Sequence, residues 1–303
     1  MESDAWQVVG KKKGSKKSRT VKNNSVPTNH GSLQSYHSDL DINSSDSIKK
    51  IKCTMEYMRI SDFWDSCQSY INKCWSITQA TSKDVGDSED LAKSLCPGEC
   101  VSPLCSLQHY DCVCYGLGNF TSCVISRHQL AFFLLFLQQF KIPHQHCYVF
   151  DPIFSPLEHS VLQELGLEVI SKNEEGKHAV QKPTVFYMPH CGKALYNNLL
   201  WRNWSPEALS QMIIIGNSFR GIEERLLSRI LQRDYVYIYR ILQAIEETQF
   251  PETSEYSDIF NDTSIHCFPV TKLQALPNHI WQQLEEPQYQ DCDELEIIRN
   301  LTL

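Results

Sequence analysis

Between residues 116 and 218, four short segments of glycine and polar residues each follow a short apolar run. Glycine lets the backbone approach a ligand closely, whereas Asp, His, Cys and Asn side chains hold hydroxyl groups, move protons or attack electrophiles. Such residues at the ends of buried strands indicate a ligand pocket. The four segments are residues 116–119, 151–152, 190–192 and 216–218.

The first of these segments partly matches the glycine-rich turn that binds dinucleotides. Gly116 and Gly118 permit a tight turn and a close approach to a phosphate or ribose, with Asn119 beside them. Thr121 stands at the third glycine position, and Asp151, which could hold ribose hydroxyls, follows Gly118 by 33 residues instead of about 20. We expect a ligand-binding turn here; the alternative is a strand–helix turn that binds nothing.

The third and fourth segments offer further candidates for chemistry. His190 and Cys191 are the residue types of a general base and a nucleophile. Adjacent residues on a strand point to opposite faces, so the pair could cooperate only from a loop, and a structural role is the alternative. Asn217 and Ser218 follow the next strand and are predicted to line the same pocket.

The cysteines do not predict a disulfide framework or a zinc site. The chain has 13 of them, an odd number without an export signal, and the dense group from Cys96 to Cys123 contains no Cys-x-x-Cys pair. Cys96 differs from the others because Pro97 follows it and turns the chain away, which leaves a thiolate that could ligate haem iron. The alternative for this Cys–Pro step is an ordinary loop.

The elements that must position these residues alternate regularly from Asp111 onward. Apolar runs of four or five residues, separated by helical patterns, are typical of a parallel sheet buried on both faces. We therefore predict an α/β fold with an open, mostly parallel, doubly wound (Rossmann-like) sheet. If the last strand runs antiparallel, residues 260–264 also reach the pocket. The predicted strands are residues 112–115, 147–150, 167–170, 184–188, 212–215 and 265–268.

The N-terminal part has a different composition. Residues 1–50 are predicted to form a disordered basic and polar tail, residues 51–104 an irregular, partly helical segment, and residues 105–303 the α/β domain. A helix is expected to start at Ser61 and Asp62.

Charge and hydropathy limit the partners and the cellular compartment that we expect for this protein. Residues 1–22 carry seven basic and two acidic side chains, whereas the whole chain has a net charge of −8, so the remainder is strongly acidic. Nucleic-acid binding is therefore not expected except through the basic tail. No apolar run approaches the roughly 20 residues of a membrane span. We expect a protein of the cytoplasm that also enters the nucleus through the tail.

Several sequence blocks, in order, resemble the SRR-like (Sensitivity to Red light Reduced) domain family. The similarity covers about residues 105 to 270, and the basic tail lies outside it. The blocks are residues 113–123, 148–152, 186–192, 195–200, 213–219 and 260–266.

The resemblance implies a regulatory protein that acts on circadian clock gene expression and on haem biosynthesis, through protein partners not yet identified. Such a regulator could sense haem or a nucleotide-like ligand in the crevice. If haem binds, Cys96 is the leading ligand, and His109 or His190 is its partner. The alternative function is an enzyme of the dinucleotide or methyl-donor type that uses Asp151 and His190.

Overall fold

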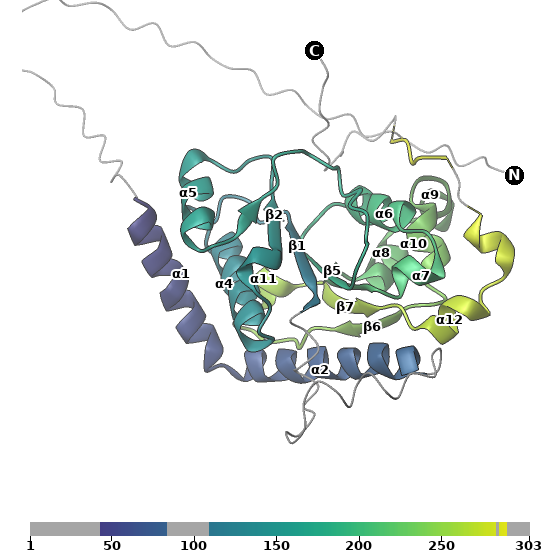
Figure 1. Cartoon of the computed structure of the whole chain (residues 1–303), viewed down its shortest axis with the longest axis horizontal. Helices are drawn as coiled ribbons and strands as arrows, with labels where there is room; N and C mark the ends of the chain where they lie inside the picture. The colour runs from purple at the N-terminus through teal and green to yellow at the C-terminus, as the bar shows by residue number, and fades with distance from the viewer. Residues whose placement is uncertain (1–42, 84–108, 283–284, 290–303) are drawn as a thin grey trace, which may run out of the picture. The chain divides into compact units, whose positions relative to one another are not determined.

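The computed structural model describes residues 43–83, 109–282 and 285–289, and their central element is one sheet of seven strands (Figure 1). The strand order is β3-β2-β1-β4-β5-β7-β6, in which neighbouring strands from β3 to β5 are parallel and β7 is antiparallel to both of its neighbours. The strands are β1 (Asp111–Tyr115), β2 (Cys147–Phe150), β3 (Glu168–Val169), β4 (Thr184–Met188), β5 (Met212–Asn217), β6 (Glu246–Gln249) and β7 (Thr263–Cys267).

The chain order reverses direction across the sheet between β1 and β4. From β1 the chain first adds β2 and β3 on one side and then returns to place β4 on the other side. In doubly wound sheets such a switch point opens a crevice at the carboxyl ends of the strands. The predicted α/β, mostly parallel, doubly wound fold is confirmed.

Helices cover both faces of the sheet (Figure 1). Alternate residues of β1 enter opposite cores, since Cys112 and Cys114 pack on one face and Val113 and Tyr115 on the other. The first face carries α1 (Ser44–Arg59), α2 (Asp62–Lys83), α4 (Val124–Gln139), α5 (Pro156–Glu164) and α11 (Ser257–Phe260). The second carries α6 (Lys193–Arg202), α7 (Pro206–Leu209), α8 (Phe219–Arg225), α9 (Ser228–Asp234), α10 (Val236–Ile241) and α12 (Val270–Ala275). Two short 3₁₀ turns are η2 (His144–His146) and η3 (Asn278–Trp281).

Helix α4 is buried on all sides in its second half. Every residue from 129 to 137 is buried, as expected of a helix that is apolar all round. Phe132 and Phe133 stack on Tyr187 of β4, with ring centroids 5.8 and 5.3 Å apart respectively. The outer side of α4 is covered by α1 and α2, where Trp64 meets Phe132 edge-on at 5.3 Å.

The helices α1 and α2 lie mostly in residues 51–104, the segment that was predicted to be irregular and partly helical. The helix start expected at Ser61 is present, because the Ser61 hydroxyl accepts a hydrogen bond from the Trp64 N–H at 3.2 Å. Helix α1 begins earlier, at Ser44, inside the segment predicted to be disordered. Its start is capped by Asn43, whose side chain accepts from the Asp46 N–H at 2.8 Å. No helix among the described residues is both long and apolar enough to cross a membrane.

Strand β6 was absent from the sequence prediction. Its residues, Glu246–Gln249, are polar and lie at the sheet edge, so they carry neither an apolar run nor an alternating pattern. Backbone pairing with β7 forms this strand: Glu247 lies opposite His266, and Thr248 lies opposite Ile265. Because β7 is antiparallel to both β5 and β6, the carboxyl end of β6 reaches the same sheet edge as that of β5.

We predict that α2 is a structural part of the domain core. Phe63 of α2 lies 4.6 Å from Tyr256 and 5.2 Å from Phe260 between ring centroids, and it is buried. Phe63→Ala should lower the free energy of unfolding by about 3 kcal/mol through lost burial and a cavity. The matched control is Ile60→Ala, since Ile60 is 82% exposed at the α1–α2 corner. Equal, small losses in urea unfolding of both variants would contradict the assignment.

Candidate functional site

A pocket of about 310 Å³ lies at the carboxyl ends of β1, β2 and β4, where the strand order reverses. We call it the crevice pocket. Three of the four polar segments contribute to it, together with residues that follow β3 and begin α6. Its lining consists of Tyr115, Gly116, Gly118, Phe150, Asp151, Pro152, Ile153, Asn173, Gly176, His190, Cys191, Gly192 and Leu195.

The glycine turn after β1 is left-handed at both glycines, with φ of +75° at Gly116 and +64° at Gly118. A Cβ atom at Gly116 would lie 2.6 Å from the Cys191 sulfur, which is closer than real Cβ contacts. A Cβ atom at Gly118 would lie 3.1 Å from the Ser126 hydroxyl. The tightest approach at this turn is therefore between Gly116 and the loop after β4.

The Asp151 carboxylate closes the glycine turn. Its Oδ2 accepts a hydrogen bond from the Gly118 N–H at 2.8 Å, and its Oδ1 accepts from the Ile153 N–H at 3.0 Å. The two residues that sequence analysis paired are thus in direct contact. The contact joins the β1 and β2 loops, and it occupies an amide that a phosphate-binding loop presents to its ligand.

His190 joins four elements at this edge. Its own N–H donates to Asn217 at 2.8 Å, and its backbone is left-handed with φ of +56°. The Gln129 amide nitrogen lies 3.1 Å from Nδ1, and Asn261 Oδ1 lies 2.9 Å from Nε2. Because an amide nitrogen only donates, Nδ1 accepts and the protonated Nε2 donates to Asn261, which makes the ring a neutral tautomer.

The Cys191 thiol points away from the His190 ring contacts. Its sulfur is buried against Gly116 and donates to the Tyr115 carbonyl at 3.4 Å. The His190 ring is engaged by Gln129 and Asn261 instead. The structure therefore brings both residues to the crevice pocket without joining them as a nucleophile and base.

Three predicted residues lie outside the lining of the crevice pocket. Asn217 donates to the Cys191 carbonyl at 3.1 Å, and so ties β5 to the loop after β4. Ser218 caps α8 by accepting from the Gly221 N–H at 2.8 Å. The Asn119 carbonyl accepts from the Cys123 N–H at 2.8 Å within the turn. None of these three residues lines the crevice pocket as the structure describes it.

Sequence analysis missed Gln129, Asn261 as a partner of His190, and the two pocket residues after β3. Gln129 had a visible signal, since it is a polar residue that directly precedes the long apolar run of α4 and is itself buried. Its amide nitrogen donates also to the Ile259 carbonyl at 3.2 Å. Asn173 and Gly176 lie in a segment without periodicity, so only the fold places them in the pocket.

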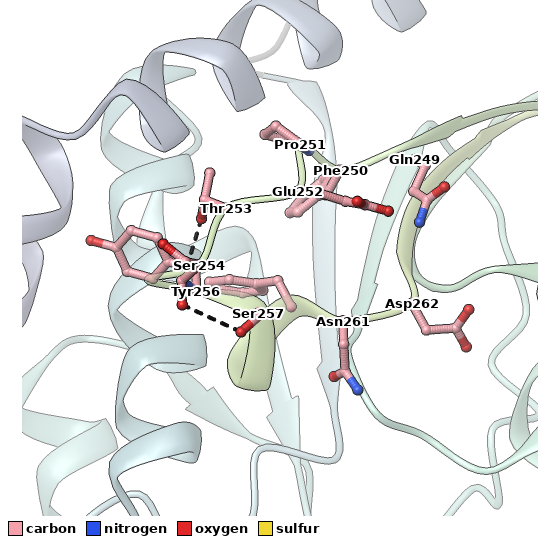
Figure 2. Close-up of a pocket in the computed structure, with 11 residues that line it drawn as sticks. Gln249, Phe250, Pro251, Glu252, Thr253, Ser254, Tyr256, Ser257, Asn261 and Asp262 are labelled. Atoms are coloured by element: carbon pink, nitrogen blue, oxygen red, sulfur yellow. Dashed lines mark hydrogen bonds between the residues drawn. The ribbon is translucent and has the colours of Figure 1, made fainter.

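A second hollow of about 400 Å³ lies inside the β6–β7 connection (Figure 2). We call it the loop pocket; its lining comes from residues 249–254, 256–257 and 260–262. The antiparallel course of β7 brings Asn261 to the crevice edge, as the sequence predicted for that case. Asn261 lines the loop pocket while its side chain holds His190 of the crevice pocket, so the two hollows share this hydrogen bond.

A buried polar cluster joins β6 and β7 to the start of α8. Glu247 of β6 accepts from the Ser218 hydroxyl and from the Arg220 N–H at 3.1 Å. His266 of β7 is fully buried 3.7 Å from Glu247, and its Nδ1 donates to the Ile214 carbonyl at 3.1 Å. Burial lowers the pKa of His266, while the negative charges of Glu247 and Asp262 act in the opposite direction.

The two histidine candidates for haem ligation lie apart in the structure. His109 precedes β1 and His190 follows β4, so these two candidates lie at opposite edges of a parallel sheet. A five-residue strand spans about 16 Å, so His109 and His190 are separate candidates for the partner of Cys96. Cys96 lies outside the described residues. No group of three or more His, Cys, Asp or Glu side chains suited to a metal occurs in the described part of the chain.

Comparison with known proteins gives one consistent family. The SRR1 domain matches residues 102–267. An SRR1-like protein of Mus musculus is 50% identical over 208 residues, which cover 65% of this chain and 81% of that protein. An SRR1-like protein of Drosophila melanogaster is 35% identical over 53% of this chain and 56% of its own length.

A plant protein shows the same sequence identity as the Drosophila melanogaster protein. The Arabidopsis thaliana protein SENSITIVITY TO RED LIGHT REDUCED 1 is 35% identical over 158 residues, which cover 52% of this chain and 58% of that protein. No solved structure matches the chain. The match to the SRR1 domain, residues 102–267, spans all seven strands of the sheet.

We predict that Gly116 tolerates a side chain less well than Gly118. Both alanine variants pay about 1 kcal/mol for the left-handed backbone, but only Gly116→Ala also drives a methyl group into the Cys191 sulfur. Urea unfolding should therefore show the larger loss for Gly116→Ala. Cys191→Ala added to Gly116→Ala should recover the excess loss and leave the cost of the backbone. Equal losses for the two glycines, or no recovery, would refute the close contact.

We also predict that His266 makes the protein less stable in mild acid. The pKa of His266 in the folded state lies below its value of about 6.5 in the unfolded state. Below pH 6.5 the unfolded state therefore binds more protons at this residue than the folded state does. Stability should fall as the pH drops below about 6.5, by at most about 1.4 kcal/mol per pH unit. His266→Gln should flatten this slope, whatever its effect on absolute stability. An exposed control, His279→Gln, should keep the slope, and a wild-type slope in His266→Gln would contradict the assignment.

Proposed function

The chain belongs to the SRR1 domain family, and we propose from that premise that it is a regulatory protein of light-linked and circadian gene expression. The red-light name of the Arabidopsis relative supports the regulatory part of this proposal. The clock and haem-biosynthesis outputs come from the family resemblance. The observation that carries the proposal is the crevice pocket at the switch point of the sheet, where a small ligand could be sensed.

The contacts of the candidate catalytic residues favour sensing over catalysis. Both ring nitrogens of His190 are hydrogen-bonded to side chains, and the Cys191 thiol faces a backbone carbonyl. A general base needs a free acceptor within reach of its substrate. A ligand that contacts His190 would instead disturb the hydrogen bonds to Gln129 and Asn261, and so change the packing of α4 and of the β6–β7 connection.

An enzyme that uses a nucleoside methyl donor is the second candidate. The observation that favours it is the crevice pocket at the switch point of the sheet, where the Asp151 carboxylate beside the glycine turn could hold ribose hydroxyls. Shared architecture alone does not establish a reaction. An enzyme that uses a dinucleotide is less favoured, because the Gly118 N–H already donates its hydrogen bond to the Asp151 carboxylate.

We propose that the link to haem biosynthesis does not require haem in the crevice pocket. His190 would have to give up a hydrogen bond before it could bind iron, and His109 lies at the other sheet edge. A haem titration followed by the Soret band tests this point on wild type, Cys96→Ala, His109→Ala and His190→Ala. A spectral change lost in His190→Ala would overturn it, whether or not the change is also lost in Cys96→Ala. A change kept in His190→Ala, or no change in wild type, would support it.

The partners and compartment follow from charge. We propose that the acidic domain acts through protein partners, because its net negative charge opposes binding to nucleic acid. The seven basic residues among positions 1–22 are proposed to serve nuclear entry of a protein that also works in the cytoplasm.

The regulatory proposal is tested by rescue in cells. Cells depleted of the protein and carrying a clock-gene reporter should lose amplitude or shift period, and the full chain should restore the rhythm. A crevice variant, Ile153→Asp, should rescue poorly at equal protein level, whereas Leu227→Asp should rescue fully. Both changes place a charge on an exposed aliphatic side chain, but only Ile153 lines the crevice pocket. An unchanged rhythm after depletion would refute the proposal.

A further inference from the structure

We infer that the crevice pocket takes a nucleoside that carries no phosphate group, with an adenosine-based methyl donor as the representative ligand. The inference rests on the proposed ligand binding in this pocket and specifies its chemistry. Three features of the pocket carry it: the Asp151 carboxylate at the glycine turn, the apolar wall beside it, and the start of α6 across from it.

The carboxylate excludes phosphate from the place where the fold would otherwise bind it. In phosphate-binding turns, glycine N–H groups and a helix start present positive partial charge to the anion. Here the Gly118 N–H donates to Asp151 Oδ2 at 2.8 Å. A phosphate at this turn would lose that donor and face a negative charge at short range, and like charges oppose each other strongly in a partly buried site. A ribose hydroxyl instead can donate to a free lone pair of the carboxylate.

The wall beside the carboxylate suits a flat ring. Phe150, Pro152 and Ile153 follow one another around Asp151 along the β2 end, and Leu195 faces the same pocket from α6. Ile153 is 50% exposed, which is high for an isoleucine, and a bound base would remove this side chain from water. A volume of about 310 Å³ lies at the lower end of the range for small-molecule sites.

The opposite side of the pocket suits a carboxylate or another acceptor. Helix α6 has ten residues, begins after Gly192 and has no side chain that caps its first turn. Gly192 and Leu195 both line the pocket, so the start of this helix and its N–H groups border it. Lys193 is the first residue of this helix but does not line the pocket, so the positive partial charge on this side comes from the backbone N–H groups. A nucleoside with an amino-acid tail matches a pocket that is negative at one side and positive at the other.

Calorimetric titration of the full chain tests this inference with four probes: adenosine, S-adenosylmethionine, AMP and NAD. Adenosine or S-adenosylmethionine should bind at least tenfold more tightly than AMP and NAD. Asp151→Asn, which removes the charge at nearly constant size, should narrow the ratio of adenosine to AMP affinity toward one. This readout compares two ligands on one variant, so it does not depend on the stability cost of the changed turn.

A matched pair of variants that should fold tests whether the ligand binds in the crevice pocket. Ile153→Asp should weaken the binding of adenosine or S-adenosylmethionine at least tenfold, whereas Leu227→Asp should leave it unchanged. Leu227 is 59% exposed and does not line the crevice pocket. Binding that is insensitive to Ile153→Asp would overturn the assignment of the ligand to this pocket.

The outcomes separate this inference from the proposed function. Tighter binding of AMP or NAD than of adenosine, lost in Ile153→Asp, would overturn the exclusion of phosphate but support a ligand-sensing crevice. Binding of none of the four probes would overturn the inference, while the rhythm rescue would still decide whether the protein is a regulator.

Discussion

The burial of helix α4 is the constraint from which the rest of the structure follows. A helix that is apolar on every side cannot lie on a sheet with its outer face in water, so a second layer must cover it. In this chain α1 and α2 provide that layer, and Phe63 and Trp64 of α2 both reach Phe132 of α4. These two helices precede the region that defines the family, yet they complete its core.

The same helix anchors the functional edge of the sheet. Gln129 is a buried polar residue at the point where α4 passes beneath the crevice, and it needs partners because an unsatisfied buried amide is costly. It finds them in His190 and in the carbonyl of Ile259. Through His190 and Asn261 this contact connects the loops after β4 and before β7. The edge that borders the crevice pocket is therefore coupled to the main core by hydrogen bonds.

This coupling gives a physical basis for the regulatory role that we propose. A ligand that alters the His190 contacts changes the relative stability of two arrangements of the loops above the sheet, and a partner protein can respond to either. The loop pocket lies on the far side of the shared hydrogen bond, next to the acidic residues Glu252 and Asp262. The crevice pocket and the loop pocket are thus connected through the hydrogen bond between His190 and Asn261.

The class of the fold, the strands of its parallel part and the loops at their carboxyl ends could all be predicted from the amino-acid sequence. Buried parallel strands such as 147–150 and 184–188 are continuous apolar runs, and that signal is local. It also placed Gly116, Gly118 and Asp151 at one site, since the ends of neighbouring parallel strands share an edge. Only the tertiary structure decided the roles of these residues. Asp151 holds the turn, Cys191 packs against Gly116, and the polar strand β6 forms because β7 offers it a backbone to pair with. These outcomes depend on contacts between residues far apart in the chain, which no local pattern of residue types records.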